Sequence, residues 1–311
     1  MNIDEKNVIS GRFAPSPTGR MHLGNVFSAL LSWLSVKSQG GDWLLRIEDI
    51  DPQRSKQHYA DQIMRDLEWL GLTWDEGPYY QSQRGDIYEE HLNKLQSQGL
   101  LYHSYKTRAE RLAVSAPQEK SPSPRKTPLS PLVSRGAETP KWEGAVCSAT
   151  PNILLKVSDE VITYNDLHYG EQRVDVKKEI GDFIVRRRDG AWAYQLAVVV
   201  DDALMGITEV VRGRDLLQSA GQQIYLGGLL GFPRMQYAHL PLLCNEAGQR
   251  LSKRDKSMDL GQLQEHHSAE DIIGHLAFLA HITDKEEPCL PSDLIPLFDW
   301  QKVPLKDIPI S

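Results

Sequence analysis

The feature that most constrains the fold of this chain is a strand, a turn, a helix and a second strand in succession near the N-terminus. Residues 8–14 are expected to form a strand, a Pro/Gly-rich turn follows, and His22-Leu-Gly begins a helix with one apolar face. Residues 43–47 then predict a parallel strand reached by a right-handed crossover. Because a helix N-terminus presents unpaired N–H groups and the positive end of its dipole, this turn suits phosphate binding.

A second segment, far along the chain, completes the pattern. Gly248-Gln-Arg-Leu-Ser-Lys-Arg254 is typical of a Gly/Ser loop, and its Lys253 and Arg254 are the cations that neutralise a triphosphate. Each half alone is a weak signal, since a Gly-rich turn is more often a connector than a nucleotide site. Together they predict an ATP site at the carboxyl ends of the parallel strands, near His22 and Glu48.

The composition is that of an ordinary enzyme that carries no membrane segment. The chain has 311 residues, of which 40% are hydrophobic and 25% charged, enough for a large catalytic domain with an insertion, or for two domains. It has no run of about 18 apolar residues and no signal-peptide core. Its three cysteines are far apart and suggest no disulfide framework. We therefore expect a cytoplasmic protein without membrane contact, and a monomer.

The net charge of −7 does not exclude RNA as a partner. Residues 258–311 hold ten acidic residues and three basic ones, which leaves the rest of the chain neutral. Phosphate binding depends on local basic patches rather than on the total charge. The basic run 186–188 is either such a contact or a solvated strand edge, and the sequence leaves both open.

The middle of the chain changes character and predicts an insertion. Residues 114–141 are rich in Pro, Ser and basic residues without periodicity, which favours a flexible loop. Short β-like runs follow at 153–158 and 161–165. A hairpin is expected over 182–200, because Asp189-Gly190 is a turn signal.

Amphipathic patterns predict helices in several further places. The expected helical ranges are 55–70, 85–98, 214–230 and 268–281, and residues 238–243 are strand-like. We divide the chain into a catalytic domain of 1–100 and 182–257, an inserted domain of 101–181, and a short helical C-terminal segment of 258–311.

Several of these segments resemble the class I glutamyl-tRNA synthetases. Arg12-Phe-Ala-Pro-Ser-Pro-Thr-Gly19 is similar to that family's opening motif, and His22-Leu-Gly-Asn25 stands where its HIGH motif belongs. Arg250-Leu-Ser-Lys-Arg254 stands where the KMSKS motif belongs. The likeness runs from about residue 10 to about residue 260. It implies an α/β fold: a Rossmann-like nucleotide-binding fold with an inserted α+β acceptor-binding-like domain, a short helical C-terminal segment and no anticodon-binding domain.

The resemblance also implies which residues bind ATP. His22 and Lys253 would be catalytic, stabilising the negative charge that develops on the phosphates during amino-acid activation. The ATP-binding set that it implies comprises His22, Gly24, Asn25, Ser252, Lys253 and Arg254. Outside such a motif, a histidine before a helix is usually only a cap or a surface residue. Mg²⁺ is expected to accompany ATP on chemical grounds.

Glutamate carries two carboxylates and one ammonium, so its pocket needs cations and an anion. By resemblance, Arg12 and Arg212 would bind the carboxylates, Glu48 the α-ammonium, and the Tyr194 hydroxyl would line the pocket. The alternative for either arginine is an ordinary surface ion pair. The opening motif supplies the remaining glutamate-binding residues of the expected set, which are Phe13, Ala14, Pro15 and Ser16.

One detail points to a shorter branch of that family. Val198 stands where full-length members usually have Asn. The sequences of Leu196–Asp202 and of 212–217 resemble those of the branch that lacks an anticodon-binding domain. Members of the branch activate L-glutamate without tRNA and esterify it onto queuosine at the wobble position of the tRNA(Asp) anticodon stem-loop. Two alternatives remain: an ordinary glutamyl-tRNA synthetase core acting on the tRNA 3′ end, and a non-catalytic tRNA-binding paralogue.

The chain departs from this branch at its zinc site. Related chains often carry a Cys-x-Cys followed by Tyr and Cys. Here the matching positions are His103 and Tyr105, and the next cysteine is Cys147. These residues make a poor tetrahedral set, so we expect no structural zinc and no other protein-bound metal.

Overall fold

The computed structural model describes residues 9–105, 150–245, 248 and 259–310. Its first unit is the βαβ arrangement that the sequence predicts: β1 (Ser10–Phe13), α1 (Leu23–Lys37) and β2 (Asp42–Ile47). β1 and β2 are parallel, with Arg12 opposite Leu44. β3 (Glu76–Tyr80) extends this sheet in parallel, which the turn-like composition of that segment did not indicate.

A second sheet continues the first. Its strand order is β7-β6-β10-β9, formed by β6 (Val161–Asp166), β7 (Gly170–Asp175), β9 (Glu209–Gly213) and β10 (Gln236–Leu240). β9 lies beside β1, where the Thr208 N–H donates to the Ser10 carbonyl over 2.8 Å. β10 pairs in parallel with both β6 and β9, so the carboxyl ends of these three strands lie at one edge of the sheet.

Helix α1 lies against both sheets and is buried on most of its surface. This explains its composition, since it carries apolar residues nearly all round rather than along one stripe. Two serines that face the core find partners there: Ser32 Oγ accepts from Trp43 Nε1 over 2.9 Å, and Ser35 Oγ accepts from Trp300 Nε1 over 3.1 Å. The core around α1 is thereby tied to the C-terminal segment.

The hairpin predicted over 182–200 is wrong in its second half. β8 (Phe183–Arg186) is followed by a turn with Gly190 in the left-handed region at φ +84°, but only Arg186 and Trp192 pair across it. The chain then forms helix α5 (Tyr194–Leu204). The β-branched run within α5 is buried on all sides, and a short apolar run of this kind does not distinguish a strand from a core helix.

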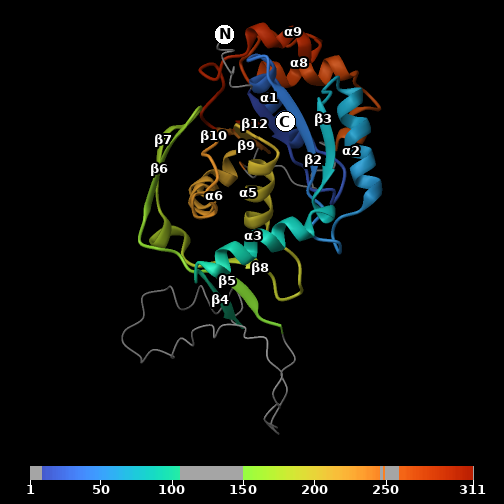
Figure 1. Ribbon diagram of the computed structural model, residues 1–311. Helices are drawn as coiled ribbons and strands as arrows, with labels where there is room; N and C mark the ends of the chain where they lie inside the picture. The colour runs from blue at the N-terminus through green and yellow to red at the C-terminus, as the bar shows by residue number, and fades with distance from the viewer. Residues whose placement is uncertain (1–8, 106–149, 246–247, 249–258, 311) are drawn as a thin grey trace, which may run out of the picture.

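The other predicted helices are confirmed within a few residues. They are α2 (Gln57–Trp69), α3 (Gly85–Ser97), α6 (Leu217–Leu230, after a 3₁₀ turn at Arg214–Leu216) and α8 (Ala269–Leu279). A third, antiparallel sheet of β4 (Leu101–Ser104), β5 (Asn152–Leu155) and β8 lies at the end of the molecule away from α8 (Figure 1). None of the described helices is long and apolar enough to cross a membrane.

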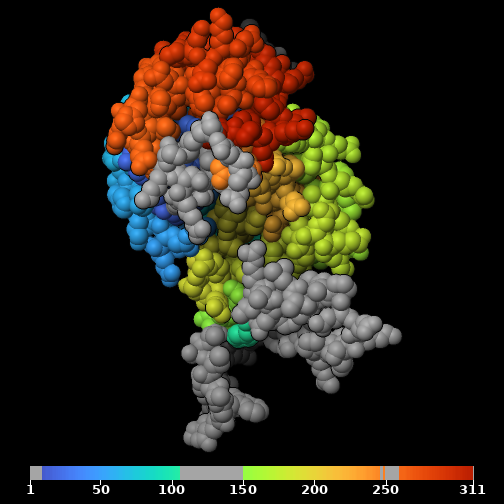
Figure 2. Space-filling model, turned by 180° about the vertical axis from the view of Figure 1, so that it is seen from behind, coloured from blue at the N-terminus to red at the C-terminus, as the bar shows by residue number. Residues whose placement is uncertain are grey.

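The C-terminal segment covers one end of the molecule and contacts both halves of the catalytic fold (Figure 2). It contains α7 (Leu260–Leu263), α8, α9 (Pro291–Leu294) and β12 (Ile308–Pro309), which pairs with β11 (Leu243–Cys244). His168 Nε2 lies 3.1 Å from the Pro304 carbonyl, and Arg214 forms a two-point ion pair with Asp307. These contacts attach the segment to the β6–β7 hairpin and to the end of β9.

The hairpin β6–β7 falls within the predicted inserted domain, yet β6 pairs with β10 of the catalytic sheet. Our division of the chain into domains stays a prediction. The loop 114–141 lies outside the described residues.

Candidate active site

The four residues expected to hold glutamate come from the carboxyl ends of three parallel strands and the start of a helix. Arg12 lies in β1, Glu48 directly follows β2, Arg212 lies in β9, and Tyr194 begins α5. The two arginines and Glu48 expose only 5–8% of their surface. Burial raises the pKa of Tyr194, and the charges of Glu48, Arg212 and Arg12 also act on it, so these three residues lie near Tyr194.

Arg12 belongs to a buried network of ion pairs and is not exposed to solvent. Its Nε and Nη2 donate to the two oxygens of Asp202 over 3.2 and 3.4 Å. Arg46, which is fully buried, places Nη1 2.7 Å from the same carboxylate. Burial opposes ionisation of Asp202, but the two guanidinium groups outweigh it and lower the pKa of this carboxyl. Arg12 is therefore not the surface ion pair that the sequence left open.

Glu48 shares Arg46 with Asp202. Arg46 Nη2 lies 3.4 Å from Glu48 Oε1, a longer and weaker contact than the one to Asp202. Burial raises the pKa of Glu48, and the positive charges of Arg46 and Arg12 only partly offset it. This carboxylate is thus short of positive charge, as expected of a group that receives an ammonium.

The sequence assigns no role to the acidic pair near the end of α5, Asp201 and Asp202. Asp201 accepts hydrogen bonds from Gln81 Nε2 at 2.8 Å, Arg84 Nε at 2.6 Å and Tyr88 Oη at 2.7 Å. Asp202, its neighbour, faces Arg12 and Arg46. The signal that could have found them is charge inside apolar runs, because Arg46 follows Leu44-Leu45 and the aspartates follow three valines.

Arg212 is oriented by a different set of partners. Its Nε donates to His239 Nε2 over 3.1 Å, Nη1 to Gln223 Oε1 over 2.8 Å, and Nη2 to the Leu216 carbonyl over 3.3 Å. The guanidinium carbon also lies 5.4 Å from the centre of the Tyr237 ring. Our sequence analysis had assigned no role to His239, Gln223 or Tyr237.

The turn before α1 lies beside this pocket. The Pro15 carbonyl accepts the Glu48 N–H over 3.0 Å, which fixes the opening motif against the end of β2. Phe13 is buried, Ala14 and Pro15 are half-buried, and Ser16 is exposed. Four of the residues expected to bind glutamate therefore continue directly from β1 into the turn.

His22 caps α1, and its imidazole lies over the helix start. The His22 N–H donates to Asn25 Oδ1 over 3.1 Å. A Cβ added at Gly24 would lie 3.1 Å from the His22 ring, so glycine leaves room for the imidazole at this position. Gly24, Asn25 and His22 thus form one compact helix N-terminus.

Ser252, Lys253 and Arg254 lie outside the described residues. The chain that follows them returns to the start of α1: Asp259 pairs with His22 in an isolated bridge, and the Leu260 N–H donates to the Met21 carbonyl over 3.0 Å. Arg20 Nε lies 3.6 Å from Asp259 Oδ1. The described chain that resumes at Asp259 is therefore anchored beside the first motif.

Metal-binding potential is low in the part of the chain that the structure describes. It contains no group of three or more His, Cys, Asp or Glu residues placed to hold an ion. His103 lies in β4, and Tyr105 is 68% exposed. Cys147 is outside the described residues, so the expectation about zinc stays a prediction.

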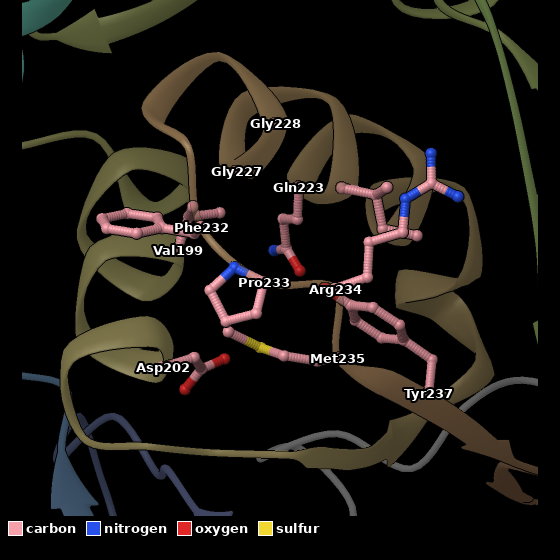
Figure 3. Close-up of a pocket in the computed structure, with 11 residues that line it drawn as sticks. Val199, Asp202, Gln223, Gly227, Gly228, Phe232, Pro233, Arg234, Met235 and Tyr237 are labelled. Carbon is pink, nitrogen blue, oxygen red and sulfur yellow. The ribbon is translucent and has the colours of Figure 1, made fainter.

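A small cavity lies between α5, α6 and the loop of residues 232–235 (Figure 3). Asp202, Gln223 and Tyr237 line it, and the same three residues contact Arg12 or Arg212. Its volume of about 20 Å³ is room for about one water molecule. The cavity is too small for an amino acid.

Comparison with known proteins identifies the family and the fold. The family model for the catalytic domain of class I tRNA synthetases (E and Q) matches residues 8–295. A solved glutamate tRNA ligase from Elizabethkingia meningosepticum, in complex with its amino acid, superposes with a TM-score of 0.77 at 27% identity, over 97% of this chain and 67% of that one. The chain belongs to the class I tRNA synthetases of the E and Q type.

More similar relatives identify the branch. The glutamyl-Q tRNA(Asp) synthetase of Symbiobacterium thermophilum is 43% identical over 97% of this chain and 96% of its own length. That of Nitratidesulfovibrio vulgaris is 40% identical over 97% and 95%. These matches confirm the branch that the sequence motifs indicated.

Proposed function

We propose that this protein activates L-glutamate with ATP in the absence of tRNA and transfers it to queuosine at the wobble position of tRNA(Asp). The observation that supports the proposal is that β1, β2, β9 and the start of α5 carry Arg12, Glu48, Arg212 and Tyr194 close to one another. The chain also aligns with 96% of the length of a glutamyl-Q relative. The protein would act in the cytoplasm as a monomer, with no membrane partner.

The pocket's charges suit glutamate. Arg12 and Arg212 would bind its carboxylates, and Glu48 its α-ammonium. Glutamine would bind poorly, because a neutral amide leaves one buried guanidinium uncompensated. Aspartate, one methylene shorter, would reach only one of the two arginines. The Tyr194 hydroxyl and the turn of residues 13–16 would complete the walls.

Activation joins the α-carboxylate of glutamate to the α-phosphorus of ATP. A carboxylate oxygen attacks in line, the bond to the bridging oxygen breaks, and pyrophosphate leaves with its electron pair. The protein supplies position and charge: the start of α1 with His22, Gly24 and Asn25 would hold the phosphates. Ser252, Lys253 and Arg254 would neutralise them. Mg²⁺ would enter with ATP, liganded by the phosphates and water.

Transfer uses a hydroxyl of the RNA. One hydroxyl of the queuosine cyclopentene-diol would attack the activated carbonyl, giving the ester and releasing AMP. Recognition of a splayed base in an anticodon loop needs mainly phosphate contacts and contacts to that base. A single site could therefore serve both the identity bases and the reacting group on one stem-loop.

The test is a pair of RNA hairpins with labelled glutamate. A tRNA(Asp) anticodon stem-loop bearing queuosine should accept glutamate, and the same hairpin with guanosine should not. Pyrophosphate exchange should proceed with glutamate, ATP and Mg²⁺ and no RNA. Transfer to the 3′-terminal adenosine of tRNA(Glu), with the queuosine hairpin inert, would establish the ordinary synthetase instead. RNA binding without any exchange would establish the non-catalytic paralogue.

A further inference from the structure

Three neighbouring parallel strands place one side chain each in a continuous row ending at the glutamate pocket. Arg212 in β9 is in register with His239 in β10, and Tyr237, two residues before His239, is in register with Asp166 at the end of β6. His239 Nδ1 lies 2.6 Å from Asp166 Oδ2, and Arg212 Nε lies 3.1 Å from His239 Nε2.

The two ends of the row fix the proton on the imidazole between them. Arg212 Nε–H can only donate, so His239 Nε2 must carry a lone pair. The single ring proton of neutral His239 is then on Nδ1, where it donates to Asp166. Burial lowers the pKa of His239. Burial opposes ionisation of Asp166, but the hydrogen bonds that its carboxylate accepts from His239 and from backbone N–H groups lower its pKa.

The row also determines which face of Arg212 remains for a ligand. A guanidinium has five N–H groups. Among the described residues, His239, Gln223 and the Leu216 carbonyl accept three of those of Arg212. Gln223 is itself oriented, since its Nε2 donates to Gln195 Oε1 over 2.8 Å. Two N–H groups are left, the number that a carboxylate binds in a two-point contact.

Asp166 and His239 expose 1% and 0% of their surface, so neither can touch substrate from where it lies. We infer that Asp166 and His239 are positioning residues, whose hydrogen-bonded row holds Arg212 in the orientation and protonation pattern that binds a carboxylate of glutamate. The inference rests on the proposed function, since it assumes that Arg212 binds the amino acid.

Asp166→Asn tests the row with little other disturbance. Asp166 Oδ1 accepts the backbone N–H groups of His168, Tyr169 and His239. The asparagine would keep its oxygen there and turn its NH₂ group toward His239 Nδ1. The imidazole would have to move its proton to Nε2, where it would face the Arg212 Nε–H, donor against donor. An Asp→Asn change beside a catalytic histidine acts through this kind of tautomer change.

Glutamate and ATP should respond differently to this substitution. Loss of a hydrogen bond to a charged group predicts a roughly ten- to hundredfold rise in the Kd and KM for glutamate in Asp166→Asn. The KM for ATP should stay within about threefold, because the role proposed for Arg212 is at the carboxylate of the amino acid. His239→Leu should behave alike, and His239→Gln, whose amide oxygen can accept from Arg212, should recover part of the affinity.

Asp182→Asn is the matched control. Asp182 is a half-buried carboxylate, which accepts from Tyr102 Oη at 2.8 Å and from the Val157 N–H at 3.0 Å, beside the third sheet. It should lower the melting temperature without raising the KM for glutamate. An equal loss for glutamate and ATP in Asp166→Asn, or no loss at all, would overturn the inference. Failure of the wild-type protein to exchange pyrophosphate would instead count against the proposed function.

A spectroscopic measurement needs no activity. In protein labelled with ¹⁵N-histidine, the ring nitrogens of His239 should show the Nδ1–H tautomer in the wild type and the Nε2–H tautomer in Asp166→Asn. An Nε2–H tautomer in the wild type would contradict the proton assignment directly.

Discussion

Arg12 and Asp202 form a buried two-point contact across 190 residues of sequence, with Nε 3.2 Å from Oδ1 and Nη2 3.4 Å from Oδ2. The contact joins β1, in the first half of the catalytic fold, to α5, which follows the predicted insertion. Asp202 also fixes the Arg12 guanidinium at the edge of the proposed glutamate pocket. Stability and the proposed binding of glutamate therefore depend on the same pair.

Asp202→Asn should be strongly destabilising. Removing one partner of a buried ion pair leaves the other charge uncompensated, and here Arg12 would lose its carboxylate partner and Arg46 the shortest of its ion pairs. The free energy of unfolding should fall by about 3–5 kcal/mol, measured by urea denaturation. Glu287→Gln is the control, since Glu287 and Lys285 form an exposed pair at 3.9 Å. A change in Asp202→Asn no larger than in this control would show that the buried network does not stabilise the fold.

Glutamate binding should release protons at pH values around the raised pKa of Glu48. The pKa of free Glu48 is raised above its ordinary value of 4.5, because burial disfavours the charged form. An arriving ammonium favours the carboxylate and lowers that pKa again, so the part of Glu48 that is protonated must ionise on binding. Affinity should accordingly fall as the pH drops through the raised pKa.

Calorimetry in two buffers with different ionisation enthalpies measures this release. Glu48→Gln should bind glutamate weakly and without the proton linkage that the wild type shows. If the linkage persists unchanged in Glu48→Gln, another group titrates and Glu48 is not the partner of the ammonium.

Lys253→Ala should reduce the rate of glutamate activation by roughly two orders of magnitude or more, as expected when one preorganised charge donor is lost from a transition state. The affinity for glutamate, measured without ATP, should barely change, because the role expected of Lys253 is at the phosphates. Pyrophosphate exchange and calorimetry give the two quantities. Weak glutamate binding with normal turnover would contradict the assignment of Lys253 to the phosphates.

Chelation distinguishes the expected Mg²⁺ that accompanies ATP from a structural zinc ion. Dialysis against EDTA should leave the melting temperature unchanged, and Mg²⁺ alone should restore pyrophosphate exchange, because His103 and Tyr105 replace the thiolates of a zinc site. Metal analysis of the untreated protein should find zinc well below one equivalent. Unfolding on chelation, reversed only by zinc, would reveal a structural site that the sequence did not indicate.

The sequence alone determined the elements whose signals are local. The βαβ unit of β1, α1 and β2 follows from hydrophobic periodicity and from a Pro/Gly turn that stops one element and starts the next. The same is true of α2, α3, α6 and α8. Local signals failed at α5, where Val198, Val199 and Val200 favour a strand by propensity but are buried on all sides in a helix.

The candidate site divides in the same way. Arg12, His22, Glu48, Tyr194 and Arg212 could be selected because they stand in segments that resemble a known family. Their partners could not, because Asp202, His239 and Asp166 reach them only when strands and helices far apart in the sequence become neighbours. Sequence patterns report which groups must be buried, but they do not say which buried charge will meet which. That pairing is decided by the register of β6, β10 and β9 and by the position of α5, which brings Asp202 to Arg12 and Arg46. A buried polar group is stable only where the tertiary structure provides its partner.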